Sequence, residues 1–203
     1  TELVNIEGET AWYCPNTLGC PPQIKGRIEH FISRKAMNIE SLGEGKVEVL
    51  FDNNLIKDYS DLYNLKYNDI FGLEKVIVVD NEEGNTVRKV SFKEKTANNI
   101  LDAIEKSKSV PFARVLFALG IKFVGETTAK LIAKAMGSID NIINASVEEL
   151  TEIEEVGEKI AVSGRIQSRE YQKRFSDEDV KTLTAYEVSI SKLAAYDNAE
   201  SFD

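Results

Sequence analysis

The sequence has no long apolar run, no excess of positive charge and few residues that ligate metals. No stretch approaches the roughly 20 apolar residues that a membrane-spanning helix needs, and no secretory signal pattern opens the chain. The formal net charge is −9 at pH 7. That balance excludes a protein that coats nucleic acid through a broad basic face. It leaves room for local phosphate binding by backbone amides, which depends little on net charge.

Cysteine, histidine and tryptophan are scarce. The two cysteines, Cys14 and Cys20, cannot complete a tetrahedral zinc site by themselves, and a disulfide is disfavoured without a secretory signal. The single histidine, His30, lies in a helical pattern and is expected to be structural rather than a metal ligand. The single tryptophan, Trp12, is expected to anchor a core.

The hydropathy pattern predicts a mainly α-helical chain with two small β elements. With 42% hydrophobic and 29% charged residues, the 203 residues suffice for one packed domain and an appendage. Residues 3–13 read as a short strand pair, and two β-branched runs within residues 75–92 indicate an inserted β-hairpin. Helical spacing begins at Ile24. Residues 164–203 are polar with weak periodicity, and Gly164 is expected to interrupt the preceding helix.

An internal repeat is the strongest feature of the sequence. Each copy has an apolar residue, glycine, glutamate, two free positions and then a small or β-branched residue. The copies are Leu42–Val47, Phe92–Ala97, Val124–Ala129 and Val156–Ala161, and Lys93 replaces the glycine in the second copy. The candidate first helices before these copies are Ile28–Ala36, Asp61–Leu65, Pro111–Leu119 and Val147–Leu150.

Each position of the repeat has a physical interpretation. The glycine is expected to adopt a positive φ and to let the chain turn sharply just before a helix. The glutamate falls in the first helical turn, where negative charge suits the helix dipole. The small residue lets the second helix pack closely on the first. In the third copy an apolar stripe follows at helical spacing, at Ala129, Ile132, Ala133 and Met136. Every copy is thus predicted to fold as helix, tight turn and helix.

Turns of this kind leave N–H groups at a helix N-terminus, where anions bind. Several of them could hold the regularly spaced phosphates of duplex DNA without reading bases. Ordinary helical hairpins that serve protein interaction are the alternative, and a single copy would favour that alternative. Four copies with nearly the same pattern favour DNA binding. The predicted contacts are Gly43, Gly45, Lys46, Lys122, Gly125, Thr127, Gly157 and Lys159.

Two longer runs resemble bacterial NAD-dependent DNA ligases. One joins Cys14–Asn16, Cys20–Gln23, His30–Ile39 and Leu42–Glu44, and the other joins Phe112–Ile121 and Val124–Glu126. The resemblance covers about residues 10–163 and fades after Ala161. It implies a zinc-finger remnant at residues 1–23, a domain of tandem helix-hairpin-helix motifs at residues 24–163, and an unassigned tail at residues 164–203.

Enzymes of that family seal nicks in duplex DNA during replication and repair. A lysine in a Lys-x-Asp-Gly motif is adenylated from NAD, AMP passes to the 5′ phosphate, and the 3′ hydroxyl attacks. This sequence contains no Lys-x-Asp-Gly motif. The resemblance therefore implies a C-terminal part of a bacterial, cytoplasmic ligase that is inactive alone. The NAD site and the magnesium expected for activity would belong to the rest of the enzyme.

The family's zinc finger has four cysteines in two pairs. Cys14 and Cys20 match the second pair, and the first is expected to precede Thr1. The resemblance thus implies zinc, with an incomplete set of ligands in this chain. A repair protein of another class that uses the same DNA-binding motif is the remaining alternative.

Overall fold

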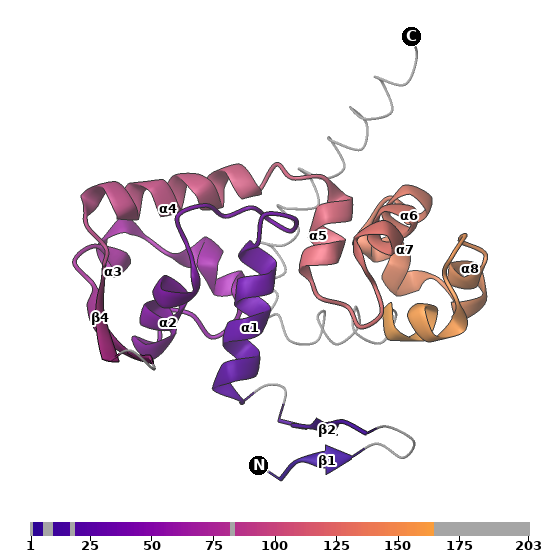
Figure 1. Cartoon of the computed structure of the whole chain (residues 1–203). Coiled ribbons are helices and arrows are strands. Elements are labelled where there is room, and N and C mark those ends of the chain that lie inside the picture. The colour runs from indigo at the N-terminus through magenta and orange to yellow at the C-terminus, as the bar shows by residue number, and fades with distance from the viewer. Residues whose placement is uncertain (1, 6–9, 17–18, 82–83, 165–203) are drawn as a thin grey trace.

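Helices make up most of the chain, with two small β-hairpins (Figure 1). The computed structural model describes residues 2–5, 10–16, 19–81 and 84–164, and it describes the side chains in these ranges except at 77–81 and 84–88. No helix of this described part is long and apolar enough to cross a membrane. The predicted fold class, mainly α with tandem helix-hairpin-helix motifs and an inserted β-hairpin, is confirmed.

The first half of the chain contains both β-hairpins, which flank a group of helices. Its elements are β1 (Val4–Asn5), β2 (Trp12–Tyr13), α1 (Pro21–Ile32), α2 (Glu44–Asp52), the 3-10 helix η1 (Tyr59–Asn64), α3 (Tyr67–Ile70), β3 (Glu74–Asn81), β4 (Gly84–Ser91) and α4 (Glu94–Ser107). The rest of the described chain is helical: α5 (Phe112–Ala118), α6 (Glu126–Met136), α7 (Ile139–Asn144), α8 (Val147–Thr151) and a further helical segment at residues 158–164. The long helix α4 lies over the first group of helices and leads into α5 (Figure 1).

Three of the four repeat copies join two helices, as predicted. Numbered in chain order, the first hairpin joins α1 to α2, the third joins α5 to α6, and the fourth joins α8 to the helical segment at 158–164. The second copy differs, because β4 rather than a helix precedes α4. The predicted first helices shift accordingly: Pro21 at N1 starts α1 earlier than Ile28, and residues 61–65 fall in and just after a 3-10 turn instead of an α-helix.

The same two positions of every copy are buried. The apolar residue before the glycine position is at most 7% exposed, and the small or β-branched residue four after it is at most 1% exposed. The same backbone hydrogen bond forms the first helical turn in all four copies. The N–H of the small or β-branched residue donates to the carbonyl of the glycine position at 2.8–3.0 Å. The pairs are Leu42 with Val47, Phe92 with Ala97, Val124 with Ala129, and Val156 with Ala161.

The inserted hairpin confirms the strand prediction for residues 75–92. Strands β3 and β4 pair antiparallel from Glu74–Ser91 to Asn81–Gly84. Phe92 closes the base of the hairpin, where its carbonyl accepts from the Gly72 N–H and its own N–H donates to Leu73, both at 2.9 Å. Lys75 at the start of β3 forms ion pairs with Asp52 and Glu48 of α2. These contacts fix the base of the hairpin to the helical body.

The N-terminal strands confirm one prediction and contradict another. Strands β1 and β2 pair antiparallel, with Val4 opposite Tyr13 and Asn5 opposite Trp12, and they extend away from the helices (Figure 1). The expectation that Trp12 anchors a core is wrong, because its side chain is 66% exposed. The pair is only two residues long on each side, which is too small to bury an indole against a second layer.

Four polar contacts hold the first hairpin against the third. The His30 ring nitrogen Nε2 lies 2.8 Å from the Phe117 carbonyl oxygen, and the two rings meet edge to face. The Arg114 guanidinium donates to the carbonyls of Ala36, at 2.8 Å, and of Arg34. Lys35 forms an ion pair with Glu126 at 3.2 Å. His30 is therefore structural, as expected, and the turns that precede α2 and α6 are tied together.

Replacing Arg114 by Met should destabilise this arrangement. The substitution leaves one half-buried and one exposed carbonyl without their charged donor, so we expect the free energy of unfolding to fall by about 1–3 kcal/mol. Chemical denaturation of wild type and variant measures the difference. Lys95→Met, at an exposed position of α4, is the matched control and should change stability by less than about 0.5 kcal/mol. Equal stability of Arg114→Met and wild type would contradict the role of this contact.

Candidate nucleic-acid interface

The turns of the first, third and fourth hairpins share one backbone feature. In each, the residue two before the glycine has a left-handed conformation: Ser41 at φ 64°, Phe123 at φ 70° and Glu155 at φ 62°. In the third hairpin the Val124 N–H also bonds to the Ile121 carbonyl at 3.0 Å. The chain therefore reverses at the position two before the glycine, and the buried aliphatic residue between them anchors the turn.

The expectation of positive φ at the glycines is wrong. Gly43 has φ −113° and Gly125 has φ −84°, with ψ near 180° in both, and Gly157 is not among the glycines with positive φ. Each glycine instead occupies the N-cap, where extended backbone is usual. The reversal had already occurred two residues earlier, so the turn does not require glycine at the N-cap.

The space around these three glycines is open, as it is around four other described glycines. A Cβ built on Gly43, Gly125 or Gly157 would meet no atom of the described chain within 4 Å. Gly43, Gly125 and Gly157 are exposed at the surface. A larger residue would thus be tolerated by the described fold, and what it would obstruct is the approach of another molecule to the helix N-terminus.

The helices that follow the turns lack side-chain caps, as do α1 and α5, whereas α7 and α8 have them. Among the residues that the structure describes, no side chain accepts a hydrogen bond at the N-cap of α2, α4 or α6. By contrast, Ser138 caps α7 and Ser146 caps α8, each by accepting a backbone N–H. Serine at the N-cap stabilises a helix by roughly 0.5–2 kcal/mol relative to alanine. Helices α2 and α6 lack this stabilisation and present first-turn N–H groups that an anion can use.

The predicted lysines and threonine around the turns lie in different settings. Lys46 is half-buried and donates to the Ser41 carbonyl, so it braces its own turn. Partial burial lowers the pKa of its ammonium below the ordinary lysine value. Lys122 and Thr127 are exposed beside Gly125, and the Lys122 ammonium lies 5.0 Å from the centre of the Phe123 ring. Lys159 is exposed beside Gly157, and Gly45 is half-buried in the first turn of α2.

Glu126 confirms the helix-start interpretation of the glutamates and adds a charge effect. It is the first residue of α6, and Lys35 and Lys130 contact its carboxylate at 3.2 and 3.0 Å. Hydrogen bonds from Lys130 and then Lys35 hold the pKa of Glu126 below that of an ordinary glutamate. The negative charge at the third hairpin is therefore balanced by two lysines, one of them from the first hairpin.

The fourth hairpin has a different charge balance. Glu154, Glu155 and Glu158 surround Gly157 and are all exposed, and Lys159 is the nearby cation in the sequence. Within the described ranges these carboxylates form no ion pair, and negative charge close to a helix N-terminus opposes the approach of a second anion. The geometry of the turn is thus repeated, but its electrostatic suitability for a phosphate is not.

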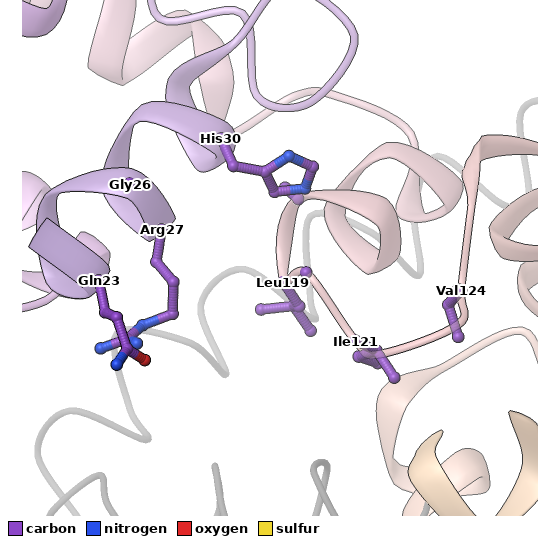
Figure 2. Close-up of a pocket in the computed structure, with 9 residues that line it drawn as sticks. Gln23, Gly26, Arg27, His30, Leu119, Ile121 and Val124 are labelled. Atoms are coloured by element: carbon purple, nitrogen blue, oxygen red, sulfur yellow. The ribbon is translucent and has the colours of Figure 1, made fainter. Parts of the chain in front are cut away.

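A groove lies between α1 and the turn of the third hairpin (Figure 2). It has a volume of about 600 Å³ and is open to solvent. Gln23, Arg27 and His30 of α1 point into it from one side, and Leu119, Ile121 and Val124 lie on the other. Its lining is mainly apolar, with the Arg27 guanidinium as a charged group. The groove adjoins the third turn and forms one edge of the candidate interface.

Several residues of the interface were not found from the sequence. Ser41, Phe123 and Glu155 carry the left-handed turn, yet none is the glycine or asparagine that such a conformation favours. Arg114 connects the first and third hairpins across 78 residues of sequence, and no local pattern indicates that contact. Ser41, Phe123 and Glu155 each lie two residues before a glycine of the aligned repeat. That shared position was the one feature of the sequence that could have indicated them.

Cys14 and Cys20 lie at a turn between β2 and α1. The Asn16 carbonyl accepts from the Cys20 N–H at 3.1 Å, and its side chain accepts from the Gly19 N–H at 2.9 Å. Both thiols are free and half-exposed. Within the described ranges, no group of three or more His, Cys, Asp or Glu side chains is placed to hold a metal ion. Two thiolates supply half of a tetrahedral zinc site, so these residues do not complete one alone.

Comparison with known proteins identifies two parts of the chain. A family model described as "NAD-dependent DNA ligase C4 zinc finger domain" matches residues 1–21, and one described as "Helix-hairpin-helix motif" matches residues 114–168. The chain is 51% identical over 163 residues to a DNA ligase of Phocaeicola vulgatus and 50% identical over 163 residues to one of Bacteroides fragilis. The predicted resemblance to bacterial NAD-dependent DNA ligases is confirmed.

The comparison also sets the extent of the similarity to the ligases. Both alignments cover 80% of the chain but 22% of the ligase, so the chain spans about a fifth of the length of these relatives. A DNA ligase of Christiangramia forsetii is 44% identical over 202 residues, which is 98% of the chain and 28% of that protein. The resemblance therefore continues beyond Ala161 in this relative, whereas the alignments with the first two ligases span 163 residues. Residues 158–164 are helical, Gly164 included. The expected interruption of the helix at Gly164 falls at the edge of the described part, since residues 165–203 lie outside it.

The lowered pKa of Glu126 predicts a measurable titration. Because the folded pKa lies below the unfolded one, the contribution of this carboxylate to stability is present above the unfolded pKa and is lost as pH falls through the folded pKa. Carboxyl-detected NMR should give a midpoint for Glu126 below the ordinary glutamate value. Lys35→Ala and Lys130→Ala should each raise that midpoint, more so at low salt. A midpoint that neither substitution moves would contradict the pairing.

Proposed function

We propose that this chain is the DNA-binding part of an NAD-dependent DNA ligase that seals nicks in duplex DNA. The observation that carries the proposal is the pair of uncapped helix N-termini at α2 and α6, each preceded by an exposed glycine with open space above it. The match of residues 114–168 to the helix-hairpin-helix motif supports it, as do the ligase relatives. The bound group is the DNA backbone, so the grip is independent of base sequence.

The first and third hairpins form the principal contact in this proposal. Their turns are tied together by Arg114 and by the Lys35–Glu126 pair, so two N-termini act as one rigid surface. Phosphates that bind there meet peptide N–H groups, the positive end of a helix dipole and the exposed Lys122. Gly45, Thr127 and the braced Lys46 belong to the same surface.

The fourth hairpin contributes less, and the second serves the fold. Around Gly157 the exposed glutamates offset the effect of Lys159. In the second hairpin Lys93 occupies the N-cap of α4, and the turn continues from β4. Few phosphates are neutralised overall, and the chain carries a net charge of −9. Binding should therefore fall with salt less steeply than for a basic DNA-binding protein.

Substituting valine at the N-cap positions tests the grip. Since Gly125 has an extended conformation and open space, Gly125→Val should fold normally and yet bind duplex about tenfold more weakly, because the side chain blocks phosphate from the amides. The effect of Gly157→Val should be smaller, and that of Lys93→Val smaller still. Fluorescence anisotropy with labelled nicked and intact duplexes gives the affinities, and circular dichroism confirms folding.

A protein-interaction module would give a different pattern in the same assay. In that case wild type would not bind duplex DNA, or all three valine variants would bind as wild type does. A preference for nicked over intact duplex would favour the ligase over another repair protein with the same motif. No such preference, together with a graded loss across the variants, would keep the DNA grip and remove the assignment to nick sealing.

We expect that this chain does not react with NAD to form a covalent adenylate. The nucleophile of the family is a lysine in Lys-x-Asp-Gly, and the 203 residues contain no such motif. Incubation with labelled NAD and magnesium should leave the protein unlabelled after denaturation. A covalent adenylate would show that another lysine acts as the nucleophile. Cys14 and Cys20 supply two of the four ligands of a tetrahedral zinc site. We propose that they bind zinc together with two further thiolates that this sequence does not contain.

A further inference from the structure

The third hairpin exposes a phenylalanine at the residue of its turn that has a left-handed backbone conformation. Phe123 has φ 70° and its side chain is 56% exposed. A bulky residue with positive φ is an outlier, because its Cβ crowds the backbone in the left-handed region. Ser41 and Glu155 hold the same position in the first and fourth hairpins. The turn therefore fixes the conformation, and the aromatic ring is particular to the third hairpin.

The described fold does not use this ring. Its neighbours Ile121 and Val124 are 3% and 7% exposed and anchor the turn on both sides, whereas Phe123 lies outside the buried core. The Lys122 ammonium lies over the ring, 5.0 Å from its centre. Asparagine would suit the left-handed backbone better and would expose no apolar surface. Strain and exposure at one residue point to a role in binding.

We propose that the Phe123 ring packs against the deoxyribose of the DNA strand whose phosphate is bound at the N-terminus of α6. This inference rests on the proposed function. Two residues lie between Phe123 and Glu126, the first residue of α6, so the Phe123 Cα lies within about 10 Å of the Glu126 Cα. That reach spans neighbouring nucleotides of one strand, which rise about 3.4 Å each along the helix axis.

The sugar is the chemically appropriate surface for this ring. It is the apolar part of a nucleotide that faces outward between phosphates, and it is the same in every sequence. The left-handed turn fixes the direction of the Phe123 Cα–Cβ bond, so the side chain leaves the turn toward solvent before binding. Lys122, stacked on the ring, then lies beside the adjacent phosphate. The third hairpin would thus combine amide, apolar and cationic contacts with one strand.

Phe123→Asn isolates the contribution of the ring. Asparagine accepts a positive φ, so the thermal midpoint should be unchanged or raised. Duplex affinity should fall about tenfold, which corresponds to the loss of roughly 50 Å² of buried apolar contact. Because the ring neutralises no phosphate, the slope of log K against log salt should stay as in wild type. Lys122→Gln should instead reduce that slope by about 1.

Phe71→Asn is the matched control. Phe71 is 51% exposed, stacks on Tyr67 and ends α3, far in sequence from the glycine turns. Its substitution should leave duplex affinity unchanged. If Phe123→Asn lowers the thermal midpoint, Phe123→Gly replaces it, since glycine adopts the left-handed conformation at no steric cost.

Each outcome decides the inference. Wild-type affinity in a folded Phe123→Asn protein would overturn it and leave the proposed function standing. A loss of affinity with a shallower salt slope would also overturn it, because the ring would then act only by positioning Lys122. Failure of wild type to bind any duplex would overturn both proposals. A tenfold loss at constant salt slope, with Phe71→Asn unaffected, would establish the contact.

Discussion

The packing of two buried side chains across each turn underlies the rest of this structure. In every repeat copy an apolar residue just before the N-cap and a small or β-branched residue four after it are almost completely buried. These two contacts pull the start of the second helix onto the first. A larger residue at Ala129 or Ala161 would separate the helices, because overpacked cores distort. With the turn fixed from inside, the outer face of the helix N-terminus needs no cap from the chain and is left for a ligand.

Charge explains how an acidic chain can still present anion sites. The net charge of −9 is spread over the whole sequence, whereas the binding surface proposed here depends on groups within a few ångströms of a helix start. At the third hairpin two lysines compensate Glu126, whereas at the fourth no ion pair among the described residues compensates the glutamates. Interactions between exposed charges fade beyond about 10 Å at ordinary salt. At α6 the local arrangement of charge therefore outweighs the average.

The sequence predicted what repeats locally. The helices, the inserted hairpin and the buried positions Leu42, Val124 and Ala129 follow from periodicity and spacing. The predicted DNA-contacting residues lie in or beside the turns, because they were chosen from the aligned repeat. Their contact with DNA is part of the proposed function. The sequence could not reveal which residue of the turn takes the left-handed conformation, because Phe123 and Glu155 oppose the usual preference for glycine. Nor could it reveal Arg114, whose contacts join segments far apart in the chain.

The central claim is that backbone amides at the starts of α2 and α6 receive the phosphates of duplex DNA. Titration of the ¹⁵N-labelled chain with a short nicked duplex measures it directly, residue by residue. The amide resonances of Glu44, Gly45, Thr127 and Thr128 should shift first and most, with those of α4 nearly unchanged. Shifts confined to β1 and β2 or to α7, with the α2 and α6 starts unaffected, would contradict the claim.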